Sequence, residues 1–314
     1  MSPTSVAEDP SVFRVERWTM QRSVLWVVLA AGLWGTTGTA AFYMGPDVSP
    51  VAIGAATMGL GGVVLAAWGG RATLALWKDT RSRGLLALGA LGTITYPLAF
   101  YSGMATAGIA LGNVIALGLG PLTAALLEWG VDRRRPSISW WMASCAALVG
   151  IFLMAGSTVE LGGGRPGNVG LGVGLAVLAG LAYGSYTYVL GKLSDKGHTP
   201  RAVAGGVFGA GAPLLLVVLA LTGTPLLATP ERVGLAAYLV LGPMVIAYLA
   251  FTRALATLRA STVATIALLE PVIATALAVL VVGEVLGPLA IGGIVLVLVS
   301  LVVFASSRGP QLRV

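Results

Sequence analysis

The stretch ASTVATIALLEPVIATAL, residues 260–277, holds a single charged side chain, Glu270, in an apolar run that continues to Val282. Hydrocarbon offers a carboxylate no water, and an acidic residue at the centre of a membrane helix costs about 3 kcal/mol on insertion scales. A carboxylate in such a run needs a polar partner or a function. The stretch therefore indicates a membrane helix and, at Glu270, the first candidate for a functional residue.

The composition of the whole chain is that of an integral membrane protein. Of its 314 residues, 57% are hydrophobic and 10% are charged, and the mean hydropathy is +0.91, whereas soluble domains carry roughly 25% charged residues. The net charge of +7 could suit a nucleic acid, but the basic residues lie in short segments between apolar runs, so no nucleic-acid partner is expected. A lone Cys145 and a lone His198 offer no disulfide and no metal cluster, so no cofactor is predicted.

Apolar windows of about 20 residues recur along the chain, and this length crosses a hydrocarbon core ~30 Å thick. The break at residues 105–108 contains neither a charge nor a proline and is the least marked of the boundaries. We expect ten membrane helices, at residues 24–44, 50–70, 84–104, 109–129, 139–157, 169–190, 201–221, 232–252, 261–282 and 287–305.

Basic residues assign the two sides of the membrane. With the amino terminus inside, all of the 19 Lys and Arg residues except Arg165 and Arg232 fall in cytoplasmic segments, as the positive-inside rule requires. The predicted organisation is a polar cytoplasmic tail (1–23), a first half (24–157), an extracytoplasmic linker (158–168), a second half (169–305) and a cytoplasmic tail (306–314).

The two halves repeat each other weakly at an offset near 150 residues. Residues 110–127, ALGNVIALGLGPLTAALL, align without gaps with residues 260–277, which pairs Gly120 with Glu270. Each half has five helices, an odd number, so the halves enter the membrane in opposite orientations. Inverted repeats of this kind are typical of secondary transporters, whose substrate site lies between the repeats near the middle of the membrane.

Four motifs in order resemble those of the drug/metabolite transporter superfamily, specifically the EamA-type exporters: LWGTTGTA (33–40), LGLGPLTAALLEW (117–129), GLAYGSYTYVLGK (180–192) and LLEPVIATALAVLVVGE (268–284). The resemblance implies a multi-pass protein of the cytoplasmic membrane, expected in a bacterium, that exports amino acids, other small organic metabolites or drugs by alternating access. Arg134 departs from the pattern, since an acidic residue often stands there in the family. This departure argues against equivalent acidic gates in the two halves.

Glu270 shares a helix face with the small residues Ala267 and Ala274, which leave room for a cavity. Pro271 cannot donate a backbone hydrogen bond, so the carbonyl of Ala267 is freed beside the carboxylate. Desolvation favours the protonated carboxyl, so we expect Glu270 to bind a proton or a substrate amine. The alternative is a protonated Glu270 that only bonds a neighbouring helix.

Polar and aromatic side chains at matching depths complete the predicted site. Asn113 lies seven residues before Gly120 and is expected to orient polar groups of the substrate, or to join two helices at about 1 kcal/mol. Aromatic rings can hold a cation, although rings near helix ends are often interface anchors. The alternative for the hydroxyls of Thr37 and Ser185 is a hydrogen bond to their own helix backbone. The other predicted lining residues are Trp34, Thr37, Tyr96, Tyr101, Tyr183, Ser185 and Tyr186.

Two further expectations concern packing. Gly180 with Gly184, and Gly205 with Gly209, are small-residue pairs that allow helices to approach closely. Glu128, near Arg133 to Arg135, is expected to be an interfacial ion-pair residue.

The sequence therefore predicts an all-α membrane protein with ten transmembrane helices in two inverted five-helix repeats and both termini cytoplasmic. The predicted function is secondary transport of a small organic substrate, with protons as the expected coupling ion and membrane lipid as the surroundings. A passive facilitator or cation-selective channel is the alternative. An enzyme is disfavoured because no His, Asp or Ser cluster lies at a membrane edge, and ATP-driven transport because no P-loop occurs.

Overall fold

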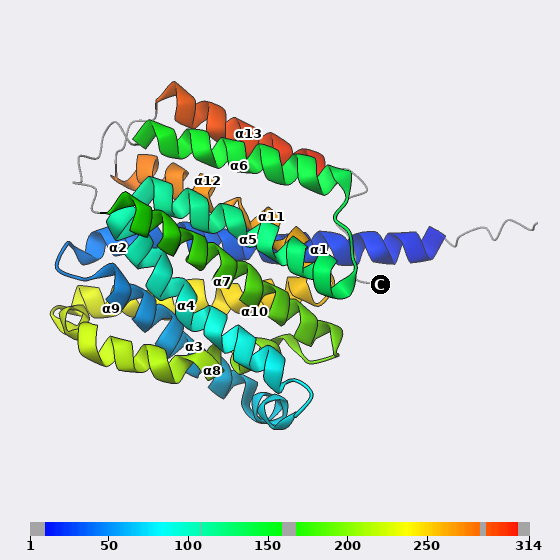
Figure 1. Ribbon diagram of the computed structural model, residues 1–314, viewed down its shortest axis with the longest axis horizontal. Coiled ribbons are helices and arrows are strands. Elements are labelled where there is room, and N and C mark those ends of the chain that lie inside the picture. The colour runs from blue at the N-terminus through cyan, green and yellow to red at the C-terminus, as the bar shows by residue number, and fades with distance from the viewer. Residues whose placement is uncertain (1–9, 108, 159–167, 283–286, 307–314) are drawn as a thin grey trace, which may run out of the picture.

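The structure, a computed structural model, describes residues 10–107, 109–158, 168–282 and 287–306, and every regular element in these ranges is helical. The helices lie side by side in one bundle (Figure 1). Eight helical runs in the described part are long and apolar enough to cross a membrane, and two apolar helices, Ile138–Met154 and Pro288–Phe304, are shorter. The prediction of an all-helical membrane protein is confirmed.

The first half of the chain holds α1 (Pro10–Gly35), α2 (Thr37–Met44), α3 (Pro50–Lys78), α4 (Arg83–Ala107), α5 (Ile109–Asp132) and α6 (Ile138–Thr158). The second half holds α7 (Val169–Asp195), α8 (Pro200–Thr222), η1 (Thr224–Leu227), α9 (Pro230–Leu239), η2 (Val240–Ile246), α10 (Ala247–Leu255), α11 (Ala260–Ala267), α12 (Glu270–Leu277), η3 (Ala278–Val282) and α13 (Pro288–Ser306).

Several predicted membrane helices are interrupted. The first is divided into α1 and α2, the eighth into α9, η2 and α10, and the ninth into α11, α12 and η3. Helix α1 also begins earlier than its apolar part, so residues 10–23 of the predicted tail are helical. Of the predicted linker, residues 159–167 lie outside the described part, as does Glu284.

Helix starts follow from local chemistry. Ser49 and Asn168 precede α3 and α7, and their side chains accept hydrogen bonds from the backbone N–H groups of Ala52 and Leu171, both at 3.1 Å. Such caps satisfy N–H groups that a helix leaves without partners. Helix α3 changes direction at Gly70, whose φ of 51° favours glycine. This kink falls where the sequence predicted the end of the second membrane helix.

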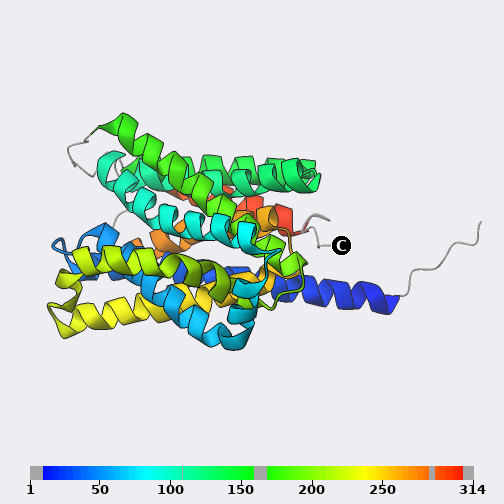
Figure 2. The same cartoon turned by 60° about the horizontal axis from the view of Figure 1, so that its bottom comes forward.

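Helix pairing follows the sequence repeat. The second helix of each half packs on its counterpart, α3 on α8, and so does the fifth, α6 on α13. The first helix of each half packs on the third and fourth helices of the other, so α1 contacts α10, α11 and α12, while α7 contacts α4 and α5. Helices α6 and α13 lie side by side at the top edge of the bundle in Figure 1, and in Figure 2 the visible parts of α13 lie close to α6, partly hidden by other helices. The pairing is thus unchanged when the halves are exchanged.

Glycines allow two equivalent helix crossings. A Cβ atom at Gly35 would lie 2.7 Å from Cγ2 of Ile273, and one at Gly184 would lie 2.4 Å from Cβ of Thr123. Thr123 and Ile273 occupy the same position in the sequence repeat. Predicted close packing at Gly184 is confirmed, because nothing larger than hydrogen fits there.

The two sides of the bundle are distinguished here by the chain termini. We call the side on which α1 begins and α13 ends the terminal side; it lies to the right in Figure 1. Helices α5 and α7 end there and α11 begins there. The first helices of the two halves, α1 and α7, run in opposite directions (Figure 1).

Candidate functional site

A cavity lies among helices of both halves, with about 620 Å³ of empty space counting the solvent at its mouth. Its walls are mostly aromatic and apolar, with a single acidic side chain. The lining residues are Trp34, Thr37, Gly54, Thr57, Met58, Tyr96, Pro97, Phe100, Tyr101, Leu117, Tyr183, Tyr186, Pro243, Met244, Tyr248 and Glu270.

Most residues predicted for the site meet at this cavity: Glu270, Trp34, Thr37, Tyr96, Tyr101, Tyr183 and Tyr186 line it. Ser185 and Asn113 are half-buried and are not among the lining residues. Ser185 follows Tyr183 by two positions, which turns it to another face of α7. Asn113 lies one helical turn beyond Leu117, farther from the terminal side.

The helix break at Glu270 gives the carboxylate its position. Helix α11 ends at Ala267, and the N–H groups of Leu268 and Leu269 bond carbonyls three residues back, at 3.1 Å each, before α12 begins. Pro271 sits in the first turn of α12, where a missing N–H leaves no helical bond unmade. Glu270 is half-buried and faces the cavity.

The Glu270 carboxylate lacks a protein partner in the structure. Within residues 10–107, 109–158, 168–282 and 287–306, no hydrogen bond or ion pair joins it to another residue. A buried carboxylate without such a partner is costly unless it binds a proton, a cation or water. The geometry therefore gives no support to a purely structural bond from Glu270 to a neighbouring helix.

The first membrane helix is also interrupted beside Glu270. Helix α1 ends at Gly35, which packs on Ile273 one turn after the carboxylate. The hydroxyls of Thr36 and Thr37 donate to the carbonyls of Leu33 and Trp34, at 2.6 and 2.7 Å. Two interrupted helices thus cross at the site, an arrangement that secondary transporters use for binding.

Aromatic rings from both halves form a continuous wall. Trp34 is buried, its indole N–H donates to the Pro243 carbonyl at 2.8 Å, and its ring centroid lies 5.0 Å from that of Tyr248. The hydroxyls of Tyr186 and Tyr248 are 2.8 Å apart. This wall fixes the depth at which Trp34 and Tyr186 face the cavity.

Tyr96, which belongs to the first half, joins the same wall through its contact with Tyr183. Tyr183 lies 5.7 Å from Tyr96 and 5.5 Å from Tyr186, between ring centroids. Its ring fills the space beside Gly120, where an added Cβ would lie 2.2 Å from Cδ1 of Tyr183. The position that matches Glu270 in the repeat is therefore covered by an aromatic ring.

The cavity extends from Glu270 away from the terminal side. Its lining residues on α3, Gly54 to Met58, lie near the start of that helix, and those on α4, Tyr96 to Tyr101, lie in its second half. Both segments belong to the half of the bundle remote from the termini.

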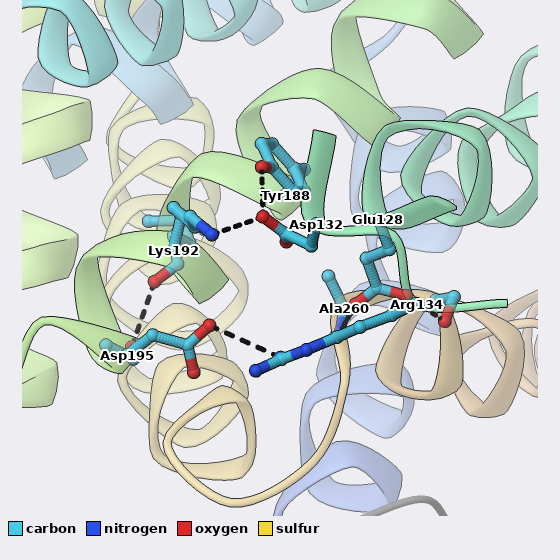
Figure 3. Close-up of polar contacts among 10 residues, drawn as sticks. Glu128, Asp132, Arg134, Tyr188, Lys192, Asp195 and Ala260 are labelled. Carbon is cyan, nitrogen blue, oxygen red and sulfur yellow. Dashed lines mark hydrogen bonds and ion pairs between the residues drawn. The ribbon is translucent and has the colours of Figure 1, made fainter. Parts of the chain in front are cut away.

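Polar contacts bridge the helices on the terminal side (Figure 3). Glu128, near the end of α5, is 4% exposed, and its carboxylate accepts hydrogen bonds from the N–H of Ala260, at 2.7 Å, and from the hydroxyl of Ser261. These groups begin α11, so Glu128 caps that helix. Among the described residues, no ion pair joins Glu128 to Arg133, Arg134 or Arg135. The buried carboxylate is instead favoured by the N–H groups and dipole of the helix N-terminus, and it attracts the charge of Arg259.

Two ion pairs join α5 and the segment after it to α7. Asp132 is paired with Lys192 and accepts a hydrogen bond from the Tyr188 hydroxyl at 3.2 Å, while Arg134 lies 3.6 Å from Asp195 (Figure 3). With the Glu128 contacts, these pairs form what we call the terminal-side network: Glu128, Asp132, Arg134, Tyr188, Lys192, Asp195, Ala260 and Ser261. The network connects α5, α7 and α11 on the terminal side of the cavity.

Comparison with known proteins identifies the family. The model of the EamA-like transporter family matches the chain twice, over residues 21–156 and 170–306. The chain belongs to the EamA-like transporter family. The two matches agree with duplicated halves and with the resemblance found in the four sequence motifs.

One relative and one solved structure extend this likeness. The "Uncharacterized transporter YwfM" of Bacillus subtilis (strain 168) is 34% identical over 292 residues, which cover 91% of this chain and 95% of that protein. A crystal structure aligns with a TM-score of 0.74 at 20% identity over 90% of this chain and 95% of the other. The latter likeness shows the fold alone. This EamA-like protein is a membrane transporter, and its family is one of transporters, not of enzymes.

Sequence reasoning missed Tyr248 and the network position of Glu128. The residue that matches Tyr248 in the repeat is Leu98, so the repeat carried no aromatic signal there. The bonds of Glu128 join residues 132 and 133 positions apart in the chain, and no local pattern predicts them.

Proposed function

We propose that this EamA-like protein is a secondary active transporter that exports small organic solutes by alternating access, using Glu270 to exchange a proton for substrate. The expected range of solutes is amino acids, related metabolites or drugs. The observation that carries the proposal is the Glu270 carboxylate: it faces a cavity on one side, while the terminal-side network lies on the other.

The proposed topology places the terminal side in the cytoplasm, with two inverted five-helix repeats. Basic residues support it, because Arg134, Lys192 and Arg253 all lie near that side. The cavity then extends toward the outside of a bacterial cytoplasmic membrane. A structure of this kind corresponds to the stage at which an exporter releases its substrate outward.

The proton cycle follows from charge balance at one carboxylate. In the outward state, a proton from the outside neutralises Glu270 and the substrate leaves. The protonated transporter then turns inward, where the proton is lost to the cytoplasm and the carboxylate can bind the next substrate. One site thus alternates between two occupants, and each occupant lowers the cost of the buried charge.

Transport in proteoliposomes under an imposed pH gradient tests this cycle. We expect the gradient to drive substrate against its concentration difference with the native protein, and Glu270→Gln to reduce that gradient-driven accumulation by at least about tenfold, because the amide cannot exchange a proton. Glu231→Gln is the matched control, since Glu231 is exposed at the start of α9.

Three results would count against the proposal. Accumulation by Glu270→Gln equal to that of the native protein would remove the coupling role. Saturable counterflow without any response to the gradient would indicate a passive facilitator, and single-channel conductance would indicate a pore.

A further inference from the structure

The cavity lining contains an acidic side chain but no basic one. Among the sixteen lining residues, all within the described part of the chain, Glu270 is the one acidic side chain and none is Lys, Arg or His. We propose that the transported substrate is an organic monocation that bears an apolar or aromatic group, and that zwitterionic amino acids are excluded. The proposal rests on the proposed function and narrows its range of solutes.

Glu270 supplies the site for the positive group. Its carboxylate has no hydrogen-bond or ion-pair partner in the described ranges, yet it is half-buried in a mostly apolar cavity. An ammonium group placed there would provide the missing counter-charge, and charge-assisted hydrogen bonds are stronger than neutral ones. A neutral solute would leave the carboxylate either protonated or unpaired.

Aromatic faces provide the rest of a cation site. The rings of Tyr96 and Phe100 are stacked at 5.3 Å, and Tyr183 and Tyr186 adjoin Tyr96 at 5.7 and 5.8 Å. Aromatic faces attract cations, and more strongly where water is excluded. The same rings also bury an apolar group, so they favour a cation attached to one over a small hydrated ion.

Half of the eight hydrogen-bond donors that line the cavity are committed to other protein groups, and the other half are tyrosine hydroxyls. The Thr37 and Thr57 hydroxyls donate to the carbonyls of Trp34 and Ile53, both at 2.7 Å. The Trp34 N–H donates to Pro243, and the hydroxyls of Tyr186 and Tyr248 bond each other. A carboxylate entering the cavity would meet the Glu270 charge with only neutral tyrosine hydroxyls to offset its own burial.

A metal ion does not suit the same site. Within the described residues, no group of three or more His, Cys, Asp or Glu side chains could hold one. Calcium takes six to eight oxygen ligands, and magnesium requires octahedral coordination. One carboxylate in an aromatic wall matches an organic cation instead.

Pairs of compounds that differ only in a carboxylate test the inference. Equilibrium binding to the purified full chain would be measured with tryptamine against tryptophan, phenethylamine against phenylalanine, and the methyl esters of both amino acids. We expect each amine and each ester to bind at least about 30-fold more tightly than its amino acid, since an unpaired buried charge costs 2 kcal/mol or more.

Four variants, two of them controls, assign the effect to the cavity. Glu270→Gln should lose amine binding, while Glu231→Gln should keep it. Tyr96→Phe keeps an aromatic face and should bind amines nearly as the native protein does, whereas Tyr96→Leu should bind them about 10-fold more weakly.

The outcomes separate this inference from the proposed function. Amino acids that bind as tightly as the amines, or a complete lack of amine binding, would overturn the inference even if a pH gradient drives transport. Selective amine binding without gradient-driven transport would uphold the substrate class and overturn the coupled exporter.

Discussion

Two acidic residues inside the bundle, the buried Glu128 and the half-buried Glu270, have different surroundings. Glu128 accepts hydrogen bonds from the first turn of α11, so its charge is offset by the backbone. Glu270 is the first residue of α12. Its carboxylate has no hydrogen-bond or ion-pair partner in the described ranges, and it faces the cavity. A satisfied carboxylate holds helices together, whereas an unsatisfied one remains available to a proton or a cation.

Removing the Glu128 carboxylate should destabilise the fold. Glu128→Ala leaves the Ala260 N–H and the Ser261 hydroxyl buried without their acceptor, so we expect the free energy of unfolding to fall by about 1–3 kcal/mol. Thermal unfolding in detergent, followed by intrinsic fluorescence, measures the change. Glu231→Ala is the control; an equal melting temperature for native protein and Glu128→Ala would show that the cap carries little stability.

Gly120 is a second position at which a small change should alter the cavity, because an added Cβ atom would meet the Tyr183 ring. An added Cβ would lie 2.2 Å from the Tyr183 ring, so Gly120→Ala must displace that ring into the cavity. We expect substrate counterflow in proteoliposomes to fall at least about tenfold, with little loss of protein from the membrane, because overpacking typically costs 1–3 kcal/mol. Gly32→Ala, which meets nothing within 4 Å, should leave counterflow unchanged.

Among the helices, the breaks and the depths of the site residues could be predicted from the sequence only in part. Proline and glycine mark the breaks near Gly35 and Glu270, and the repeat placed Trp34 and Tyr183 at one depth. Asn113 was assigned to the cavity because it shares a helix face with Gly120, but depth along α5 also decides contact. Tyr248 and the Glu128 cap depend on which helices become neighbours, and tertiary packing alone determines that.

The ion pair between α5 and α7 should act as a unit. The Asp132 side chain is 7% exposed and that of Lys192 is 31% exposed, so Lys192→Met leaves a mostly buried charge unpaired. We expect that variant to lose about 1–3 kcal/mol of unfolding free energy, and Asp132→Asn with Lys192→Met together to recover part of the loss. A double-mutant cycle of melting temperatures measures the coupling. Strictly additive losses would contradict a direct interaction.

For the whole molecule, the proposed alternating-access cycle has two states that the repeat relates by exchange of the halves, and we expect the terminal-side network to make their energies unequal. Exchanging the halves pairs Glu128 with Ala278 and Asp132 with Val282. The corresponding carboxylates are thus replaced by apolar side chains, and no such network can form on the other side from these positions. The native protein should therefore favour the state in which the terminal side is closed.

Cysteine accessibility tests this imbalance in the intact membrane. In a Cys145→Ser background, we expect Thr57→Cys, in the cavity, to react with a membrane-impermeant maleimide from outside the cell. Thr262→Cys, which replaces a side chain 1% exposed near the start of α11, should stay unreactive from the cytoplasmic side. Adding Glu128→Ala removes the α11 cap, so the population open to the cytoplasm should grow and Thr262→Cys should react several-fold faster.

Reaction of Thr57→Cys only from the cytoplasm would reverse the proposed topology. If Glu128→Ala left the rate at Thr262→Cys unchanged, the network would stabilise the fold without biasing the two states.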